Sequence, residues 1–407
     1  MRVTVIGQGY VGLTISVGAL SAGHFVVGID HSSAVIDGLK QGRSHIEGIS
    51  DEDISSGISS ELFLPTTSYD ATSDAEIVVI AVPTPLDDSG APDLSLLKSA
   101  ASSLGSALKK KTLIINESTS HPGTLREVIK PLVDAGQDFG HLYAISPERV
   151  DPGNKKFGTK NTPRIVGGLS DEARDAAVAF YSSFCDQVVP VSSAEVAEAA
   201  KLFENTFRFI NIGLVNEFSQ IMGAMGIPAD EVLEAAGTKP YGFMPFHPNV
   251  GIGGHCIPVD PLYLQARAEE HGLSSKYISV SQRINEEMPK FVVERLNAEA
   301  GGISGKKVLV VGVSYKADIA DTRETPAEKF IHYLREAGAT VSWHDPLVKS
   351  WNGENSSEID GIHDLAVVLV AHSGFTMKGW NGGPIYSVNA HPNYPDWKPL
   401  ISVRPKN

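Results

Sequence analysis

Short apolar runs alternate with helical patterns along the first part of the chain, an order typical of a parallel α/β sheet. Five runs predict buried strands, at residues 3–6, 25–29, 77–82, 112–115 and 144–146. A helical pattern through Leu20 separates the first two. Residues 49–60 are rich in Ser, Asp and Gly, and we expect a mobile surface loop there.

A long run over residues 194–225, broken by two glycines and no proline, predicts one helix of about 45 Å. Ser192 or Ser193 is the expected N-cap, and Glu195 and Glu198 suit the positive end of the helix dipole. The polar residues recur near one face: Lys201, Glu204, Asn205, Arg208, Asn211 and Asn216. The remaining positions are largely apolar, so we expect a buried helix whose polar stripe meets partners. The alternative is an amphipathic helix with one solvated face.

The last part of the chain repeats the strand and helix alternation without a Gly-x-Gly-x-x-Gly turn. Strands are predicted at residues 306–313, 340–343 and 366–370, with a helix at 327–337. The expected fold class is therefore α/β, with two Rossmann-like domains joined by a long central helix. The expected boundaries are 1–192 for a dinucleotide-binding domain, 193–300 for a central helical domain and 301–407 for a second nucleotide-binding domain.

Composition narrows the function classes. A chain of 407 residues is too long for a single hydrophobic core, so two or three domains are expected. A hydrophobic content of 42% is ordinary for a globular protein. The net charge of -14 argues against nucleic-acid and anionic-membrane partners. Cys185 and Cys256 form neither a disulfide framework nor a metal-ligand spacing, so no metal is expected. No signal peptide or membrane-spanning run is read, and we expect a cytoplasmic protein.

The first strand leads into a glycine turn with the sequence Gly7-Gln8-Gly9-Tyr10-Val11-Gly12. A helix follows this turn, and Asp30 closes the next strand. This context is the dinucleotide fingerprint, in which glycines admit the pyrophosphate and the acid accepts from the ribose hydroxyls. Asp30 repels a 2′-phosphate and favours NAD over NADP. The alternative is an ordinary strand, turn and helix with glycines for packing.

Polar residues follow three other strands, at the edge where a parallel sheet binds ligands. Thr84 lies between Pro83 and Pro85 after one strand, and Ser118 and Thr119 follow the next. For either threonine taken alone, turn capping is an equal alternative. The last of these strands leads to Glu148-Arg149, where Glu148 is a candidate base or a surface partner of Arg149.

The segment from Gly251 to Asp260 holds three glycines that crowd the approach to Cys256. A thiolate nucleophile with a nearby acid would use this layout, although a buried thiol in a tight turn is the alternative. Lys201 and Asn205 lie one helical turn apart, and both can donate to a developing oxyanion.

Two basic residues of the last domain, Lys316 and Arg323, lie where a second nucleotide's phosphates could be bound. A surface ion-pair cluster with Asp318 and Asp321 is an equal alternative.

The chain resembles the nucleotide-sugar (UDP-sugar) 6-dehydrogenase family from Val3 to about Ala371. The resemblance rests on ordered motifs: Gly7 to Gly12, Val82-Pro83-Thr84-Pro85, Glu117-Ser118-Thr119, Pro147-Glu148-Arg149, Lys201 to Glu217, Gly253 to Asp260, and Tyr315-Lys316 to Arg323-Glu324. It implies a homodimer and a four-electron oxidation of the sugar C6 hydroxyl, with NAD as acceptor and Cys256 carrying a thiohemiacetal and then a thioester.

The resemblance also implies a role for each matched residue. Lys201 and Asn205 would stabilise oxyanions, and Asp260, Glu148 and a water near Thr119 would handle protons. The implied cofactor residues are Gly7, Gly9, Tyr10, Val11, Gly12, Asp30, Pro83, Thr84, Ser118, Thr119 and Arg323. The implied substrate residues are Glu148, Arg149, Lys201, Asn205, His247, Gly251, Gly253, Tyr315 and Lys316.

Departures from the UDP-glucose pattern favour the UDP-N-acetylglucosamine branch. They occur at Glu148 to Asn154 and at Lys239 to Phe246, where an arginine of UDP-glucose enzymes aligns near Pro240. A separate departure concerns the cofactor: Val35 stands where the family often has a basic residue, about five positions after the ribose aspartate, so we expect a different affinity for the cofactor. UDP-N-acetylmannosamine and UDP-glucose remain alternative substrates. A two-electron dehydrogenase and a catalytically silent nucleotide-sugar-binding regulator are the rival functions.

Overall fold

A computed structural model describes residues 1–150, 156–359 and 361–401. Asp151 to Asn154, part of one departure from the UDP-glucose pattern, lie outside the described residues. The chain divides into two compact units. Unit 1 comprises Met1–Glu204 and Leu262–Gly272, and unit 2 comprises Asn205–Pro261 and Leu273–Asn407.

Unit 1 is built on an eight-stranded sheet with the order β3-β2-β1-β4-β5-β6-β7-β8. Its strands are β1 (Arg2–Ile6), β2 (Phe25–Ile29), β3 (Phe63–Thr66), β4 (Ile77–Ile80), β5 (Leu113–Asn116), β6 (Leu142–Ile145), β7 (Arg164–Gly168) and β8 (Val188–Pro190). Strands β1 to β6 are parallel, and β7 runs antiparallel to β6. The strand order reverses between β1 and β4, which is where a doubly wound sheet binds its ligand.

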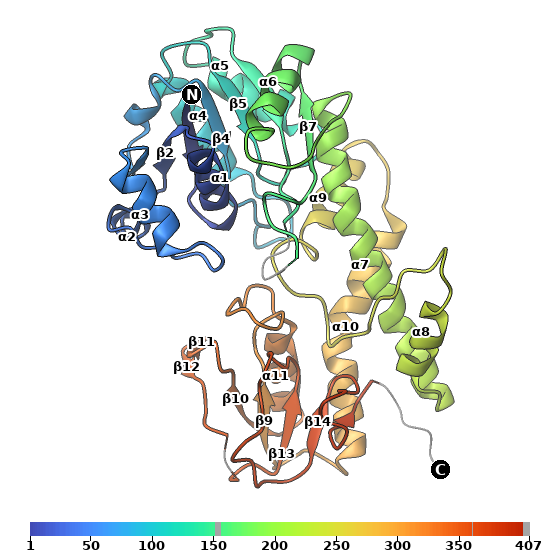
Figure 1. The fold of residues 1–407 in the computed structure, drawn as a ribbon. Coiled ribbons are helices and arrows are strands. Elements are labelled where there is room, and N and C mark those ends of the chain that lie inside the picture. The colour runs from blue at the N-terminus through green and yellow to red at the C-terminus, as the bar shows by residue number, and fades with distance from the viewer. Residues whose placement is uncertain (151–155, 360, 402–407) are drawn as a thin grey trace. The chain divides into compact units, whose positions relative to one another are not determined.

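Helices cover the sheet of unit 1 (Figure 1). They are α1 (Tyr10–Ser21), α2 (Ser33–Lys40), α3 (Asp51–Ser59), α4 (Ser95–Ala107), α5 (Lys130–Asp134) and α6 (Asp171–Tyr181), with short turns at Tyr69–Thr72 and Leu125–Ile129. Leu13 of α1 and Phe180 of α6 pack with Val3 and Val5 in one buried cluster. The apolar runs of the sequence are therefore the strands of this core.

Residues 49–60 are not the loop that their composition predicts, because Asp51–Ser59 forms α3. Ser50 accepts from the backbone N–H of Asp53, and the Asp53 side chain accepts from the N–H of Ser50. This reciprocal capping box satisfies two donors at the helix start. Ile54 is fully buried, so tertiary packing adds to the cap.

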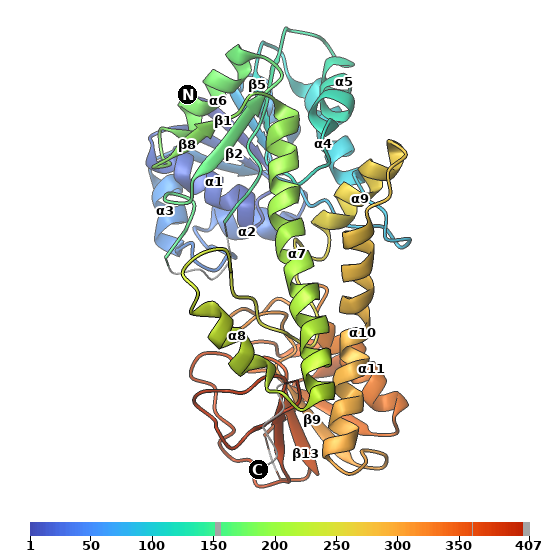
Figure 2. The same ribbon diagram turned by 90° about the vertical axis from the view of Figure 1, so that its right-hand side faces the viewer.

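Helix α7 (Ala194–Met225) matches the predicted central helix and is continuous across the boundary between the units (Figure 2). Ser193 accepts from the N–H of Val196, as an N-cap does. Within unit 2, α7 packs against α10 (Lys276–Glu299), where a Cβ on Gly213 would lie 3.0 Å from Ser281. Glycine at 213 therefore allows a close helix contact. Helix α8 (Ala229–Gly237) belongs to unit 2, whereas α9 (Asp260–Glu270) belongs to unit 1 from Leu262 onward.

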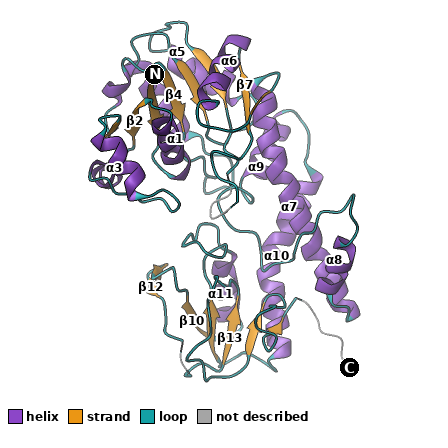
Figure 3. Cartoon of the chain, viewed as in Figure 1, coloured by secondary structure: helices purple, strands orange, loops and turns teal. Residues whose placement is uncertain are grey.

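Unit 2 contains a five-stranded parallel sheet in the order β10-β9-β13-β14-β15. The strands are β9 (Lys307–Val311), β10 (Thr340–His344), β13 (Leu365–Val368), β14 (Ile385–Ser387) and β15 (Lys398–Pro399), and β11 (Ser350–Trp351) pairs with β12 (Glu354–Asn355). Helices α10 and α11 (Pro326–Glu336) pack on one face. Loop residues, Trp397, Trp380 and Tyr394 among them, cover the other (Figure 3).

In the described part of the chain, none of the helices combines the length and the low charge that a membrane span needs.

Candidate active site

The glycine turn joins β1 to α1 in unit 1, and its first and last glycines are required by the protein itself. Gly7 has φ 85°, and a Cβ there would lie 2.3 Å from the carbonyl oxygen of Ala81. A Cβ on Gly12 would lie 1.7 Å from the carbonyl oxygen of Gly7. These two glycines allow the turn to close against the end of β4.

Gly9, the middle glycine, is exposed, and a Cβ there would meet no atom of the described residues within 4 Å. Its φ of -71° also lies in the range that any residue adopts. Neither packing nor conformation therefore requires glycine at the N-cap of α1. A glycine here leaves the N-terminus of α1 open to the close approach of a phosphate, which is the arrangement that a dinucleotide site requires.

Asp30 follows β2 and lies beside the same turn. Its carboxylate accepts from the backbone N–H of Gln8 at 2.8 Å and of Ser32 at 2.9 Å. The carboxylate thus holds the glycine turn while keeping further lone pairs for ribose hydroxyls.

Thr84 and Thr119 follow β4 and β5, and both side chains are partly exposed at the carboxyl edge of the sheet. Pro83 is exposed beside Thr84. Ser118 is 6% exposed, and its hydroxyl accepts from the N–H of Val82 at 2.9 Å. The Ser118 hydroxyl therefore joins the ends of β4 and β5. Of Ser118 and Thr119, only Thr119 has a hydroxyl that is open to a ligand.

Glu148 follows β6, and its carboxylate is held from two sides. One oxygen accepts from the backbone N–H groups of Arg149 and Val150, at 2.6 and 2.5 Å. The other accepts from Arg164 at 3.2 Å. Arg149 itself pairs with Glu204 of α7 at 2.7 Å, so Glu148 and Arg149 do not form the surface ion pair that was one reading of the sequence.

Glu117 and Arg164 are buried neighbours of Glu148 to which the sequence alone assigned no role. Arg164 Nη1 donates to Glu117 at 2.9 Å, and Tyr181 donates to the same oxygen at 2.5 Å. Burial raises the pKa of Glu117 to about 7, although Arg164 opposes the shift. Glu117 stands directly before Ser118 in a matched motif, which was the only sequence signal for it.

Lys201 and Asn205 lie one turn apart on α7 and are 8% and 7% exposed. Asn205 donates to Asp260 at 2.5 Å, and Asp260 is 1% exposed at the first turn of α9. Further along α7, Asn216 accepts from the N–H of Asn249 at 2.8 Å. Asn205 and Asn216 therefore have buried partners, whereas Arg208 of the same stripe is exposed. The expectation of a buried helix is wrong for one face of α7 in the single chain, because Phe203 and Leu214 are 67% and 59% exposed.

Glu198 does more than the sequence predicts, which is to complement the positive end of the dipole of α7. Its carboxylate is 1% exposed and accepts from the N–H groups of Gly123 at 2.6 Å and Leu125 at 3.0 Å. It thereby caps the helical segment that follows Thr119. Glu195 instead pairs with Arg126 at the surface, at 2.8 Å.

The glycines beside Cys256 let its loop lie against a neighbouring segment of unit 2. A Cβ on Gly253 would lie 2.7 Å from the Cβ of Tyr315, and one on Gly254 would lie 2.8 Å from the Tyr315 ring. The N–H of Gly254 donates to the carbonyl of Arg323 at 3.1 Å. Gly253 and Gly254 therefore allow the Cys256 loop to pack closely on Tyr315.

Cys256 is partly exposed and does not fill a core. Its carbonyl accepts from the backbone N–H groups of Val259 at 3.1 Å and Asp260 at 2.8 Å. The resulting turn leads directly into α9. It fixes the backbone of Cys256 relative to Asp260, whose side chain is held by Asn205.

The loop after β9 carries two of the expected substrate residues, Tyr315 and Lys316, and both are partly exposed. Arg323 is 62% exposed at its side chain and donates to both oxygens of Asp321, at 3.0 Å from Nε. Asp318 has φ 65° and accepts from Ser373. The carboxylates of Asp321 and Asp318 therefore have separate partners. His247 is exposed upstream of the glycine loop.

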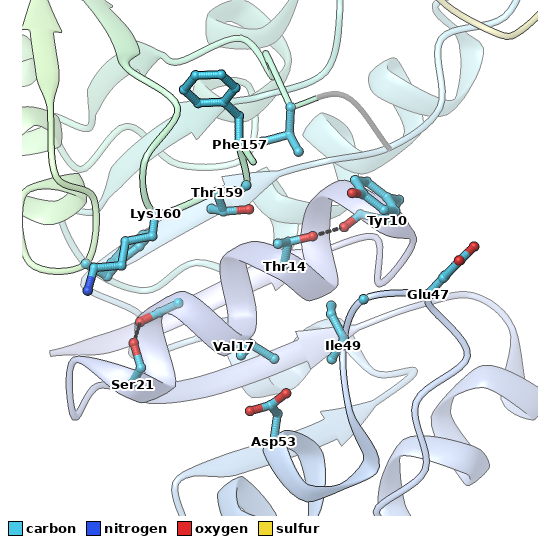
Figure 4. Close-up of a pocket in the computed structure, with 15 residues that line it drawn as sticks. Tyr10, Thr14, Val17, Ser21, Glu47, Ile49, Asp53, Phe157, Thr159 and Lys160 are labelled. Carbon is cyan, nitrogen blue, oxygen red and sulfur yellow. Dashed lines mark hydrogen bonds between the residues drawn. The ribbon is translucent and has the colours of Figure 1, made fainter. Parts of the chain in front are cut away.

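A cavity of about 520 Å³ lies along the flank of α1 in unit 1 (Figure 4). Tyr10, Thr14 and Ser21 line it from α1, and Asp53 and Lys160 line it from two other segments. Of the expected cofactor residues, Tyr10 alone lines this cavity. Its lining includes none of the residues that follow β4 and β5, although Val150, whose N–H donates to Glu148, is part of it.

Three family models match the chain in order. They are the NAD binding domain, the central domain and the UDP binding domain of the UDP-glucose/GDP-mannose dehydrogenase family, at residues 1–185, 195–287 and 309–383. A UDP-N-acetyl-D-glucosamine 6-dehydrogenase of Pseudomonas aeruginosa is 33% identical over 93% of this chain and 92% of its own.

The chain belongs to the UDP-glucose/GDP-mannose dehydrogenase family. A UDP-N-acetyl-D-mannosamine dehydrogenase of Pyrococcus horikoshii is 34% identical over 93% of this chain and 91% of its own. The structure of a UDP-glucose dehydrogenase from Pyrobaculum islandicum aligns with a TM-score of 0.89 at 25% identity, covering 99% of this chain and 98% of that one. The protein is therefore an NAD-dependent UDP-sugar dehydrogenase, an oxidoreductase whose fold and cofactor match the sequence-based expectation.

Proposed function

We propose that this enzyme oxidises UDP-N-acetyl-D-glucosamine at C6 to the uronate, with the removal of four electrons. The observation that carries the four-electron part is the partly exposed Cys256, set by a hydrogen-bonded turn four residues before the buried Asp260. The relative from Pseudomonas aeruginosa and the departures at Lys239 to Phe246 support the choice of sugar. UDP-N-acetyl-D-mannosamine is the second candidate, supported by the relative from Pyrococcus horikoshii.

The proposed steps follow the chemistry of a thiolate. NAD, when bound, accepts a hydride in each of two successive oxidations. The Cys256 thiolate adds to the C6 aldehyde left by the first oxidation and forms a thiohemiacetal. The second oxidation leaves a thioester, and water then releases the uronate and restores the thiol. One sugar therefore yields two NADH.

The remaining catalytic roles are assigned to side chains with matching chemistry. Lys201 and Asn205 stabilise the tetrahedral oxyanions, and each such donor contributes about 3 kcal/mol in comparable sites. Asn205 uses one N–H on Asp260 and keeps a second for the substrate. Asp260 and Glu148 exchange protons with the reacting groups, and Thr119 orients a water.

Binding roles are proposed for the rest of the expected residues. Gly9 and the neighbouring turn hold the NAD pyrophosphate, Asp30 holds its ribose, and Pro83, Thr84, Ser118 and Arg323 form further parts of the cofactor site. The proposed substrate contacts are Glu148, Arg149, Lys201, Asn205, His247, Gly251, Gly253, Tyr315 and Lys316. The NAD-binding role is given to residues 1–192, the Cys256 loop and dimerisation to 193–300, and UDP-sugar binding to 301–407.

We also propose a homodimer formed through α7. The helix exposes a stripe of apolar side chains at intervals of four and seven residues: Phe203, Phe207, Leu214, Ile221 and Met225, between 39% and 67% exposed. Such spacing forms one apolar helix face, and a face of this size on a soluble protein usually marks an interface.

The substrate is tested with purified enzyme, NAD and a panel of UDP-sugars with GDP-mannose, by NADH absorbance. We expect the highest kcat/KM with UDP-N-acetyl-D-glucosamine and two NADH per sugar consumed. A ratio of one would identify a two-electron dehydrogenase and reject the thioester. Binding of NAD and UDP-sugar without turnover would identify a silent regulator instead.

Cys256→Ser tests the nucleophile. We expect loss of uronate release by at least 1,000-fold with NAD affinity unchanged, because a hydroxyl is a far weaker nucleophile at neutral pH. The matched control is Cys185→Ala, since Cys185 is buried and its thiol donates to the carbonyl of Thr159. Uronate formation by Cys256→Ser at the wild-type rate would reject the covalent mechanism.

A further inference from the structure

We propose that Arg164 is a positioning residue that sets the orientation of the Glu148 carboxylate, and that Glu117 controls how firmly Arg164 holds it. This inference rests on the proposed role of Glu148 in proton transfer. It adds two buried residues, Arg164 and Glu117, that were assigned to neither of the proposed ligand sites.

The topology explains why Arg164 reaches this edge of the sheet. β7 runs antiparallel to β6, with Ala144 opposite Gly168 and Ile145 opposite Gly167. Arg164, the first residue of β7, therefore lies at the carboxyl end of β5 and β6, where the parallel strands present their polar residues. In a fully parallel sheet the first residue of this strand would lie at the opposite edge.

The guanidinium of Arg164 is held through Nη1 and Nη2, while its Nε has no hydrogen-bond partner among the described residues. It donates to Glu117 at 2.9 Å, to Ser146 at 3.2 Å and to Glu148 at 3.2 Å, and it stacks 4.7 Å from the centre of the Tyr181 ring. Its side chain is 3% exposed. A planar cation held this rigidly can orient a carboxylate, because its donors have fixed directions.

Glu117 and Glu148 compete for this single cation. Their carboxylates are bonded to different nitrogens of Arg164, and the Glu117 side chain is 0% exposed. Tyr181 also donates to Glu117, and Cys185 is the other titratable group near Arg164. Oε2 of Glu117 has no hydrogen-bond partner among the described residues, a position suited to a bound proton.

The charge of Glu117 therefore changes how strongly Arg164 binds the carboxylate of Glu148. When Glu117 is neutral, the positive charge of Arg164 is opposed by Glu148 alone, and the bond to Glu148 is strongest. When Glu117 ionises, it attracts the guanidinium and weakens its hold on Glu148. Burial raises the pKa of Glu117 to about 7, so this exchange falls in the neutral range. Burial opposes the charge of Arg164, but the two carboxylates outweigh it and raise its pKa, so Arg164 stays charged throughout.

The first test is a double-mutant cycle with Arg164→Lys and Glu148→Gln, measured as kcat with saturating NAD and UDP-sugar. Lysine keeps the charge but not the planar fork, so we expect kcat to fall at least tenfold. In the Glu148→Gln background the same change should alter kcat less than twofold, because the residue through which Arg164 acts is gone. An equal loss in both backgrounds would overturn the inference, since a general structural role persists without Glu148.

Arg174→Lys is the matched control, because Arg174 pairs at the surface with Asp171 and Asp175. Its kcat should stay within twofold of wild type. If Glu148→Gln itself retains full activity, the proposed role of Glu148 fails and the inference fails with it. A Glu148→Gln enzyme with little activity, beside an Arg164→Lys enzyme at the wild-type rate, rejects the role of Arg164 alone.

Glu117→Gln keeps the shape of the side chain beside Arg164, and it provides a second test if Arg164→Lys does not fold. We expect the wild-type kcat profile to show an inflection near pH 7 that Glu117→Gln abolishes, since Gln cannot ionise. An unchanged inflection would overturn the role of Glu117.

A crystal structure of Glu117→Gln or Arg164→Lys gives a readout that needs no turnover. A wild-type Glu148 orientation in Arg164→Lys would reject the positioning role.

Discussion

Gly9 differs from the other two glycines of its turn because none of the residues that the structure describes requires its small size. We predict that Gly9→Ala raises the KM for NAD at least tenfold, since the added methyl group enters space that the pyrophosphate needs. The free energy of unfolding should change by about 1 kcal/mol or less, because the new Cβ meets no atom within 4 Å. Initial rates and urea unfolding measure the two quantities.

Gly12→Ala is the matched comparison within the same turn. Its Cβ would lie 1.7 Å from the Gly7 carbonyl oxygen, so the backbone must shift and stability should fall by several kcal/mol, on the order of 3. An unchanged KM for NAD in Gly9→Ala would show that the pyrophosphate does not approach Gly9.

At the residue scale, the sequence predicted the chemical type of the site better than it predicted which side chains contact each other. The spacing of Gly7, Gly9 and Gly12 indicated NAD because the fingerprint is local. The function of Gly254 could not be predicted, because its neighbour Tyr315 is remote in sequence. Arg164 gave no signal for the same reason, since its partners come from other strands.

At the element scale, α7 was predictable and α3 was not. The run over residues 194–225 is long and apolar, so its period stands out. α3 has nine residues, Asp51–Ser59, with Gly57 among them and three acids in its first turn. Its composition resembles a loop, and its stability comes from the Ser50–Asp53 capping box and the buried Ile54. Short helices of this kind depend on caps and tertiary contacts more than on propensity.

Glu198 gives a pH prediction for the junction between α7 and the helical segment that it caps. Burial raises the pKa of Glu198 to about 7 in the native state, from an ordinary value of 4.5. The native state therefore binds the proton more tightly, and the stability linked to this group is full below pH 4.5 and lost as pH rises to 7. The stability of wild type relative to Glu198→Gln should fall by about 3 kcal/mol across this window, measured by urea unfolding.

Glu195→Gln is the control, one turn away on the same helix. A hydrogen bond from Arg126 lowers the pKa of Glu195, so its contribution to stability is lost as pH falls and has the opposite sign. The effect should be small, because both side chains are partly solvent-exposed. A difference between wild type and Glu198→Gln that does not vary with pH would mean that Glu198 is not buried as a proton-binding group.

At the scale of the whole molecule, the proposed assembly depends on the exposed apolar stripe of α7, one member of which, Phe207, also packs edge-on against Phe246. We predict that Leu214→Glu, which adds a charge at a position 59% exposed, converts the dimer to a monomer without unfolding it. An unpaired charge buried in an apolar interface costs several kcal/mol, enough to shift association at least a hundredfold. Sedimentation velocity over a concentration series measures the change. Glu234→Lys, an exposed change on α8 away from the stripe, should remain dimeric. If wild type sediments as a monomer at micromolar concentration, or Leu214→Glu as a dimer, the stripe is not the subunit interface.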